Sequence, residues 1–149
     1  LNVFKNNDIV YNREQAFGGN DLTNMIHQQK GIEVAEVERL LSAGELDAET
    51  MDTLVLPFRQ AVMQQVSRAL QFYYSSGSQG PLDSLYLAGG TSGLEGLAAL
   101  VEDEVGVVTR TANPFANMQV ASKVNAVRLQ KDAPCLLKAC GLAQRSFDI

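Results

Sequence analysis

The first fourteen residues alternate apolar and polar positions in two separate runs. LNVFK alternates once, and IVYNRE alternates again after the polar stretch NND. Alternation with a period of two is typical of a strand with one buried face, and Asn/Asp dipeptides favour tight turns. The pattern therefore predicts a β-hairpin from Leu1 to about Glu14.

After the breaker AFGG the apolar positions change to helical spacing. A short helix is predicted from three apolar residues that share one face: Leu22, Met25 and Ile26. Asn20 or Asp21 would cap this helix, and Gly31 would close it. A second helix, about 33–43, ends at Gly44 and is expected to bury Val34, Val37, Leu40 and Leu41.

The longest predicted helix follows the polar link ELDAETMD. Pro57 lies near its expected start, where a missing N–H costs little. Its apolar stripe advances by three or four residues at a time: Phe58, Val62, Val66, Ala69 and Tyr73. The Ser/Gly-rich stretch 75–81 then predicts a loop.

The last seventy residues combine short apolar runs with helical patterns. SLYLA (84–88) and VVTRT (107–111) predict buried strands on either side of a helix that Gly106 ends. NPF (113–115) breaks the second strand, and residues 116–132 show no clear pattern. A last helix is expected at about 133–145.

This order implies an α/β fold. Strand–helix–strand connections within one sheet are right-handed and make the strands parallel. A hairpin and a parallel pair together predict one mixed sheet, covered by helices.

Composition narrows the functional classes. The net charge is -5 and the pI about 4.8, which argues against nucleic-acid binding because that needs basic patches. No apolar run is long enough to cross a bilayer. Cys135 and Cys140 lie five residues apart, so we expect reduced thiols in the core, and no metal site. His27 has no ligand partner at metal spacing and is interpreted as a surface residue.

The stretch LAGGTSGLEGL (87–97) is the candidate ligand site. It matches neither the Walker A nor the G-x-G-x-x-G pattern. Gly89 and Gly90 would let a flat group lie against the backbone, and Ser92 with Glu95 fits a capping box for the next helix. The alternative is a tight turn that needs glycine only for its backbone angles. The residues alone leave both interpretations open.

The segments taken together resemble the C-terminal portion of the PilM family, the actin-like proteins of type IV pilus assembly that are related to FtsA. The resemblance covers nearly the whole chain in order. It is carried by YNREQAFGGNDLT, VAEVERL, PFRQAVMQQVSRALQFYYSS, LAGGTSGLEGLAALVEDEVG, ANPFANM, SKVNA and DAPCLLKACGLAQRSFD.

The resemblance implies an actin-like, ribonuclease H-like fold with two lobes around an ATP cleft. Residues 1–149 would be the second lobe, with a reduced helical insertion at about 32–56, and the first lobe would precede Leu1. The glycine stretch would hold adenosine through Gly89, Gly90, Thr91 and Ser92.

Two further pairs of residues are assigned by the same resemblance. Gly18 and Gly19 would border the cleft at the start of the NDLT helix. Family members carry Ala-Glu-x-x-Lys, whose Glu and Lys reach the ribose and adenine. Here Glu36 and Arg39 occupy those positions, and arginine changes the geometry. The alternative is a surface ion pair at i, i+3.

The function implied is that of an ATP-binding scaffold at the inner membrane, with Mg²⁺ held only through the phosphates. The scaffold would be cytoplasmic and peripheral to the membrane through its partners, a PilN-type cytoplasmic tail and other pilus-assembly proteins. That tail would dock mainly on the first lobe, and self-association stays open. Turnover would be slow or absent, and the sequence offers no catalytic residue.

Two alternatives are an interaction module without nucleotide and an actin-fold ATPase or sugar-kinase-like enzyme. One wall of a cleft makes few contacts, so this chain alone is expected to bind ATP weakly or not at all.

Overall fold

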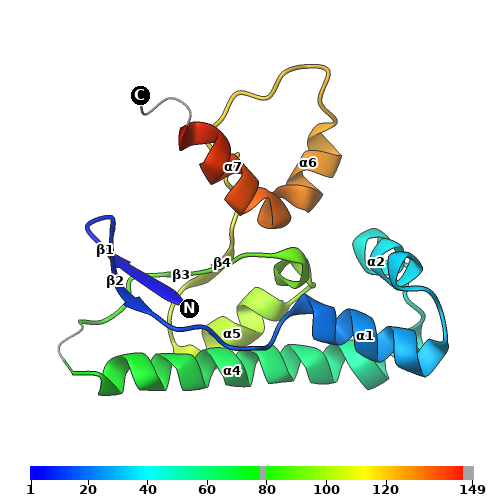
Figure 1. Ribbon diagram of the computed structural model, residues 1–149, viewed down its shortest axis with the longest axis horizontal. Coiled ribbons are helices and arrows are strands. Elements are labelled where there is room, and N and C mark those ends of the chain that lie inside the picture. The colour runs from blue at the N-terminus through cyan, green and yellow to red at the C-terminus, as the bar shows by residue number, and fades with distance from the viewer. Residues whose placement is uncertain (78–79, 146–149) are drawn as a thin grey trace. The chain divides into compact units, whose positions relative to one another are not determined.

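The computed structural model describes residues 1–77 and 80–145 (Figure 1). The chain divides into two compact units, Leu1–Pro81 and Leu82–Ile149. Two sequence features extend beyond the described residues. They are residues 78 and 79 of the Ser/Gly-rich loop and residues 146–149, which include the SFD of the last family motif.

The first unit begins with the predicted hairpin. Strands β1 (Asn2–Lys5) and β2 (Asp8–Asn12) pair antiparallel, with a bulge between Val3 and Phe4. Asn6 and Asn7 have positive φ angles of 52° and 69°. Both central residues of a two-residue hairpin turn require this conformation, and asparagine tolerates it. The turn prediction is therefore confirmed.

Helices α1 (Gly19–Lys30) and α2 (Val34–Ala43) follow. Gly31 and Gly44 close them with left-handed φ angles of 67° and 73°, as predicted. The predicted cap of α1 is wrong, because the helix begins before Asn20. Its cap is Gly18, whose N–H donates to Oδ2 of Asp21 at 2.7 Å.

In α1 and α2, fewer apolar side chains are buried than their spacing predicted. Leu22 and Ile26 are fully buried in α1, and Val37 is fully buried in α2. Met25 and Val34 are exposed instead. Each of these short helices buries only a narrow stripe of its surface, so the side chains at the edge of the stripe stay in water.

The long helix begins as predicted, one residue before Pro57, but shorter helical segments run directly into it. Asp47 caps a continuous run of α3 (Ala48–Thr50), the π-helical segment η1 (Met51–Val55) and α4 (Leu56–Ser75). The Leu56 N–H bonds to the carbonyl of Met51, five residues back. Pro57 lacks an N–H and its ring crowds the preceding turn. A π-helical turn directly before it accommodates that ring inside a continuous helix.

Aromatic contacts join the first unit together along α4. Phe17 stacks on Phe58 with ring centroids 5.3 Å apart, and Tyr11 of β2 meets Tyr73 edge-on at 5.5 Å. The core of this unit consists of residues at most 7% exposed: Val3, Leu22, Ile26, Val37, Leu54, Val55, Phe58, Ala69, Leu70 and Tyr73.

The second unit contains the predicted strand–helix–strand segment. Strands β3 (Leu85–Leu87) and β4 (Thr109–Thr111) pair parallel, and α5 (Leu97–Val105) connects them. Leu97 and Val101 are buried. Oε2 of Glu102 accepts the Thr109 N–H at 2.9 Å, which ties α5 to β4.

The C-terminal helical region differs from the single helix predicted. It comprises α6 (Ala126–Asp132), the 3₁₀ segment η3 (Ala133–Leu136) and α7 (Leu137–Gln144). Pro134 lies at the start of η3, because proline suits the first turn of a helix and breaks its interior. Cys135 is exposed and Cys140 partly so, which makes their predicted place in the core wrong.

The fold class agrees with the α/β prediction, with small sheets and covering helices. The hairpin and the parallel pair are both present. Among the described residues their hydrogen bonds form two separate two-stranded sheets, β1–β2 and β3–β4, in place of one continuous mixed sheet.

Candidate functional site

The glycine loop follows the carboxyl end of β3. Gly89 has φ 108° and ψ 174°, a conformation essentially restricted to glycine. Residues Gly90–Gly93 then form the 3₁₀ turn η2. A tight change of direction at this point therefore needs glycine at position 89 for its backbone angles.

Ser92 stabilises the loop from within. Its side chain is buried, and its hydroxyl donates to the Gly89 carbonyl at 2.7 Å. The Thr111 hydroxyl donates to the Ser92 carbonyl at 3.2 Å, so the end of β4 also holds the loop. The predicted capping box of Ser92 and Glu95 is wrong, because α5 begins at Leu97 with left-handed Gly96 as its cap. Two glycines after Ser92 delay the helix.

The 3₁₀ segment η3 covers one side of the loop. The Gly89 N–H donates to the Pro134 carbonyl at 2.9 Å. A Cβ built on Gly90 would lie 3.9 Å from Sγ of Cys135, an ordinary van der Waals contact. Sequence reasoning did not identify Pro134 or Cys135 as neighbours of the loop, since nothing in local spacing links positions so far apart.

The other side of the loop offers hydrogen-bond donors. Gly90 is exposed and Thr91 is half-buried. Within residues 1–77 and 80–145, the amide N–H groups of Gly90 and Thr91 have no hydrogen-bond acceptor. Two adjacent unpaired donors next to a side-chain-free position can serve a ribose or phosphate oxygen.

Gly18 and Gly19, at the start of α1, are held differently. Gly18 is extended, and a Cβ there would meet no atom within 4 Å. Its N–H is occupied by the Asp21 carboxylate, and the Gly19 carbonyl accepts the Thr23 hydroxyl at 3.2 Å. The Asp21 carboxylate thus occupies the helix start that would otherwise favour an anionic ligand.

Glu36 and Arg39 form a two-point ion pair on α2. Nε and Nη2 of Arg39 lie 2.9 and 3.0 Å from the two carboxylate oxygens of Glu36, and Nη1 lies 2.8 Å from Glu45. The hydrogen bonds from Arg39 lower the pKa of Glu36. Those from Glu36 and Glu45 raise the pKa of Arg39. All three groups are about half exposed, so the trio lies in water.

The candidate residues are distributed over both units. Gly18, Gly19, Glu36 and Arg39 belong to the first unit, and the stretch 89–92 belongs to the second. Among the described residues, no group of three His, Cys, Asp or Glu side chains could hold a metal ion. Nδ1 of His27 lies 2.6 Å from the carbonyl of Ile32, so this side chain of α1 contacts the backbone of the link that precedes α2.

No helix in the described part of the chain combines the length and the apolar character needed to cross a bilayer.

Comparison with known proteins identifies the class. The chain is similar to a solved chain of the "PilM-PilN type IV pilus biogenesis complex", with 30% sequence identity and a TM-score of 0.65. The match covers 85% of this chain, and this chain spans 36% of the length of that one. The fold and this match define an actin-like component of type IV pilus assembly. A family model described as "Type IV pilus assembly protein PilM" matches residues 1–147. The chain therefore belongs to the PilM family, as its resemblance predicted.

Proposed function

We propose that this chain forms the adenosine-side wall of an ATP cleft in a scaffold protein of the type IV pilus machine. Membership of the PilM family supports a role in type IV pilus assembly. The glycine loop supports ATP as the ligand. The observation that carries the proposal is the geometry of that loop. Gly89 adopts a backbone conformation restricted to glycine, and the unpaired amides of Gly90 and Thr91 follow it.

Each candidate residue has a place in this proposal. Gly90 lets adenine or ribose lie against the backbone, while the Gly90 and Thr91 amides donate to ribose or α-phosphate oxygens. Ser92 keeps the loop in shape through its bond to Gly89. Gly18 and Gly19 border the cleft, and Mg²⁺ enters only with the phosphates of ATP.

Glu36 and Arg39 would contact the ribose and adenine from α2. Arg39 has the reach for this role, because its guanidinium already spans two carboxylates. The pair would exchange one of its mutual hydrogen bonds for a ligand bond, and Glu45 would keep Arg39 in place.

The domain assignment is part of the same proposal. Residues 1–149 constitute the second lobe of an actin-like protein, and α2, α3 and η1 constitute its reduced helical insertion, at about 32–56. The length of the matched solved chain supports this, since this chain spans 36% of it. A first lobe, outside residues 1–149, would supply the other wall of the cleft.

The protein would work on the cytoplasmic side of the inner membrane, held there through its partners. The matched structure is titled as a complex of PilM with PilN, which supports a PilN-type tail as a partner. We expect that tail to dock mainly on the first lobe. ATP would set the shape of the scaffold, with hydrolysis absent or very slow, and residues 1–149 alone would not be catalytic.

Isothermal titration with ATP and Mg²⁺ tests the nucleotide site. The 149-residue chain should bind no tighter than roughly millimolar, because a one-sided site leaves the phosphates in water. A longer PilM chain that contains this sequence should bind at least tenfold more tightly. Gly90→Asp should abolish that binding, whereas Gly93→Ala should not, since a Cβ at position 93 meets nothing within 4 Å. Absence of binding by the folded longer chain would refute the proposal.

A second candidate is an interaction module that does not bind nucleotide. One observation favours it: charged groups of the first unit already satisfy one another or the backbone, with Asp21 on the Gly18 amide and Arg39 between Glu36 and Glu45. The same titration separates the two functions. A longer chain that binds a PilN-type peptide but not ATP would establish the second.

A further inference from the structure

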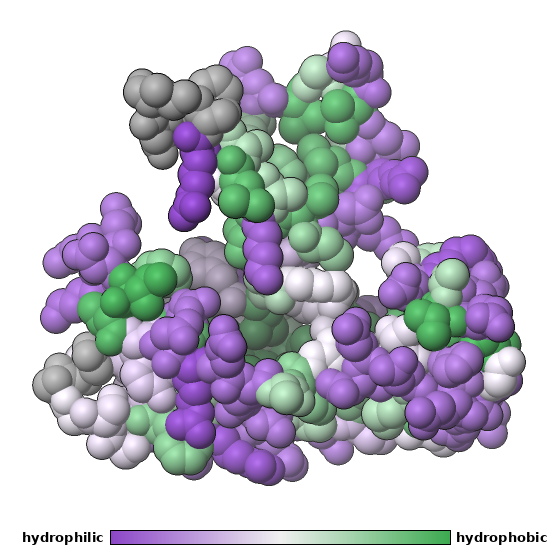
Figure 2. All heavy atoms as spheres, viewed as in Figure 1, coloured by the Kyte–Doolittle hydropathy of each residue, from purple (hydrophilic) through white to green (hydrophobic). Residues whose placement is uncertain are grey.

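The C-terminal helices leave apolar side chains in water. Neither α6 nor α7 contains a buried residue. Val127 of α6 is 82% exposed and Leu142 of α7 is 65% exposed. Helices of seven and eight residues are not stable by themselves and need packing against a surface. Figure 2 shows apolar side chains gathered over α6 and α7, with polar ones around them.

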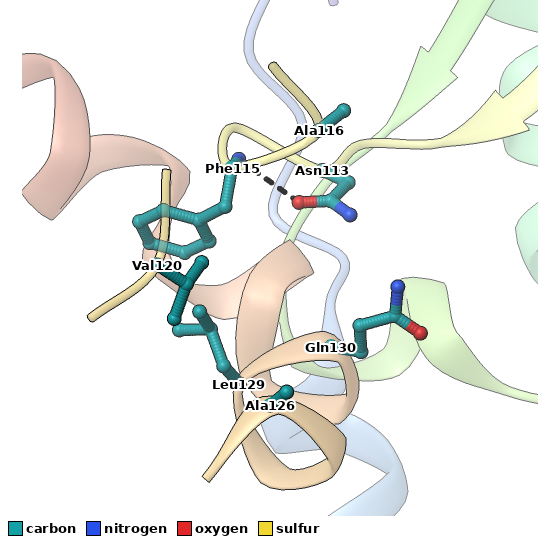
Figure 3. Close-up of a pocket in the computed structure, with 7 residues that line it drawn as sticks. All are labelled: Asn113, Phe115, Ala116, Val120, Ala126, Leu129 and Gln130. Carbon is teal, nitrogen blue, oxygen red and sulfur yellow. Dashed lines mark hydrogen bonds between the residues drawn. The ribbon is translucent and has the colours of Figure 1, made fainter. Parts of the chain in front are cut away.

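A small cavity lies where the NPF turn meets α6. Its apolar wall is formed by Phe115, Val120 and Leu129, with Ala126 beside them, while Asn113 and Gln130 contribute amides (Figure 3). The Asn113 side chain accepts the Phe115 N–H at 2.9 Å, which fixes the turn that positions the phenyl ring. The volume, about 140 Å³, suits one bulky apolar side chain.

Charge is distributed unevenly along the chain. Residues 105–145 hold six basic residues, Arg110, Lys123, Arg128, Lys131, Lys138 and Arg145, against one acidic residue, Asp132. Residues 1–104 hold the other six basic residues against fifteen acidic ones. Among the described residues only Arg128 of the basic six has an ion-pair partner, Asp132 at 3.5 Å. Lys123 lies in sequence between the lining residues Val120 and Ala126, and Lys131 directly follows Gln130; both side chains are exposed and can attract negative charge.

We infer that the cavity between the NPF turn and α6 docks a short acidic peptide segment of a partner protein. One leucine-sized side chain of the peptide enters the cavity. Its carboxylates lie opposite Lys123 and Lys131, where complementary charge orients the peptide and speeds its association. This docking site does not involve the glycine loop and does not depend on the proposed nucleotide site.

A membrane surface fits these observations less well. Helices that lie on a bilayer present one broad apolar face with bulky residues such as Trp, Phe and Leu. Here α6 exposes Val127 and α7 exposes Leu137 and Leu142, and helices of seven and eight residues are too short to present a broad apolar face. A defined cavity that fits one side chain favours a polypeptide.

Fluorescence anisotropy with defined peptides tests the inference on the 149-residue chain. The probe is a fluorescein-labelled peptide, SEEDLEEDS, with two matched peptides, SEEDAEEDS and SKKKLKKKS. We expect saturable binding of the first with a Kd on the order of 100 µM, and binding at least about fivefold weaker for the other two. Raising the salt from about 0.05 to about 0.3 M should weaken binding further.

Three variants locate the binding. Lys131→Glu should weaken the acidic peptide about tenfold, because it replaces attraction by repulsion. Arg68→Glu is the matched control, since it makes the same charge change on an exposed position of α4 in the first unit, and should leave affinity within about twofold. Ala126→Leu keeps helix propensity but fills the cavity, so it should remove the preference for leucine over alanine. Circular dichroism confirms that each variant is folded.

The inference is overturned if the acidic peptide shows no saturable binding, if the lysine peptide binds equally well, or if Lys131→Glu and Arg68→Glu behave alike. Two further outcomes also overturn it. One is Lys131-dependent binding to phosphatidylserine vesicles without binding to the peptide. The other is Lys131-dependent dimerisation in analytical ultracentrifugation, which would make a second copy the occupant.

Discussion

The amide N–H of Gly89 donates a 2.9 Å hydrogen bond to the carbonyl of Pro134, which joins the glycine loop to the start of the C-terminal helices. The loop is thus held at three points, by Pro134, by the hydroxyl of its own Ser92 and by Thr111 at the end of β4. A loop fixed on one side and open at Gly90 presents a preformed surface. Preformed surfaces lose less conformational entropy when a ligand binds.

Gly89→Ala should destabilise the second unit by about 1–3 kcal/mol, because alanine is strained at a φ of 108°. Gly93→Ala is the matched control, since position 93 has no positive φ and a Cβ there meets nothing within 4 Å. Chemical denaturation followed by circular dichroism measures both. Equal stability of the two variants would show that the loop backbone is not constrained at Gly89.

Arg39→Ala should weaken ATP binding by a longer PilM chain if Arg39 contacts the ligand, and we expect a loss of about tenfold. Glu38→Gln is the control, because Glu38 is an exposed residue of the same helix with no role in the proposed site. Titration calorimetry gives both affinities. Unchanged affinity in Arg39→Ala would show that Glu36 and Arg39 form a surface ion pair with no role in ATP binding.

Local sequence signals predicted the parts of the fold that depend on local conformation. The Asn6–Asn7 turn and the helix-closing glycines Gly31, Gly44 and Gly106 all have the positive φ angles their residue types favour. Ser92 does not cap α5, because the helix begins only at Leu97 after Gly96, and the Ser92 hydroxyl bonds instead to the Gly89 carbonyl. A capping-box spacing does not reveal that competition.

Contacts between distant segments were beyond local reasoning. The bond from Gly89 to Pro134 and the stacking of Phe17 on Phe58 join residues that no sequence period relates. The apolar spacing of α2 predicted that Val34 is buried, but Val34 is exposed. Whether a side chain is buried depends on how far the neighbouring surface extends. The glycines could be chosen as candidate ligand residues from the local sequence. Their contact with η3 could not be predicted, because it joins distant parts of the chain.

Phe58→Ala should lower the free energy of unfolding by about 3–5 kcal/mol, since the ring is 3% exposed and stacks on Phe17. Phe72→Ala, on the same helix, removes a ring that is 47% exposed. It should cost only about 0.5–1 kcal/mol, the contribution of the Arg13 guanidinium 3.8 Å above it. Denaturant titration compares them, and similar costs would contradict the assigned core.

Asp47 makes the stability of the long helix depend on pH. Hydrogen bonds from the Thr50 amide and hydroxyl, at 2.8 and 2.7 Å, hold the pKa of Asp47 below its ordinary value of 3.8, and Lys30 lowers it further. Since the folded pKa lies below the unfolded one, the carboxylate stabilises the fold above about pH 4. That stabilisation disappears as the pH falls through the folded pKa.

Asp47→Asn isolates the effect of charge, because asparagine also caps helices and can still accept the Thr50 amide. Between about pH 6 and pH 3 the melting temperature of the wild type should fall more than that of the variant, and the two curves should converge at the acid end. The difference should also shrink as salt is added, since Lys30 and Asp47 are 3.6 Å apart at the surface. Parallel melting curves across this range would show that the carboxylate at position 47 is no better held in the folded chain than in the unfolded one.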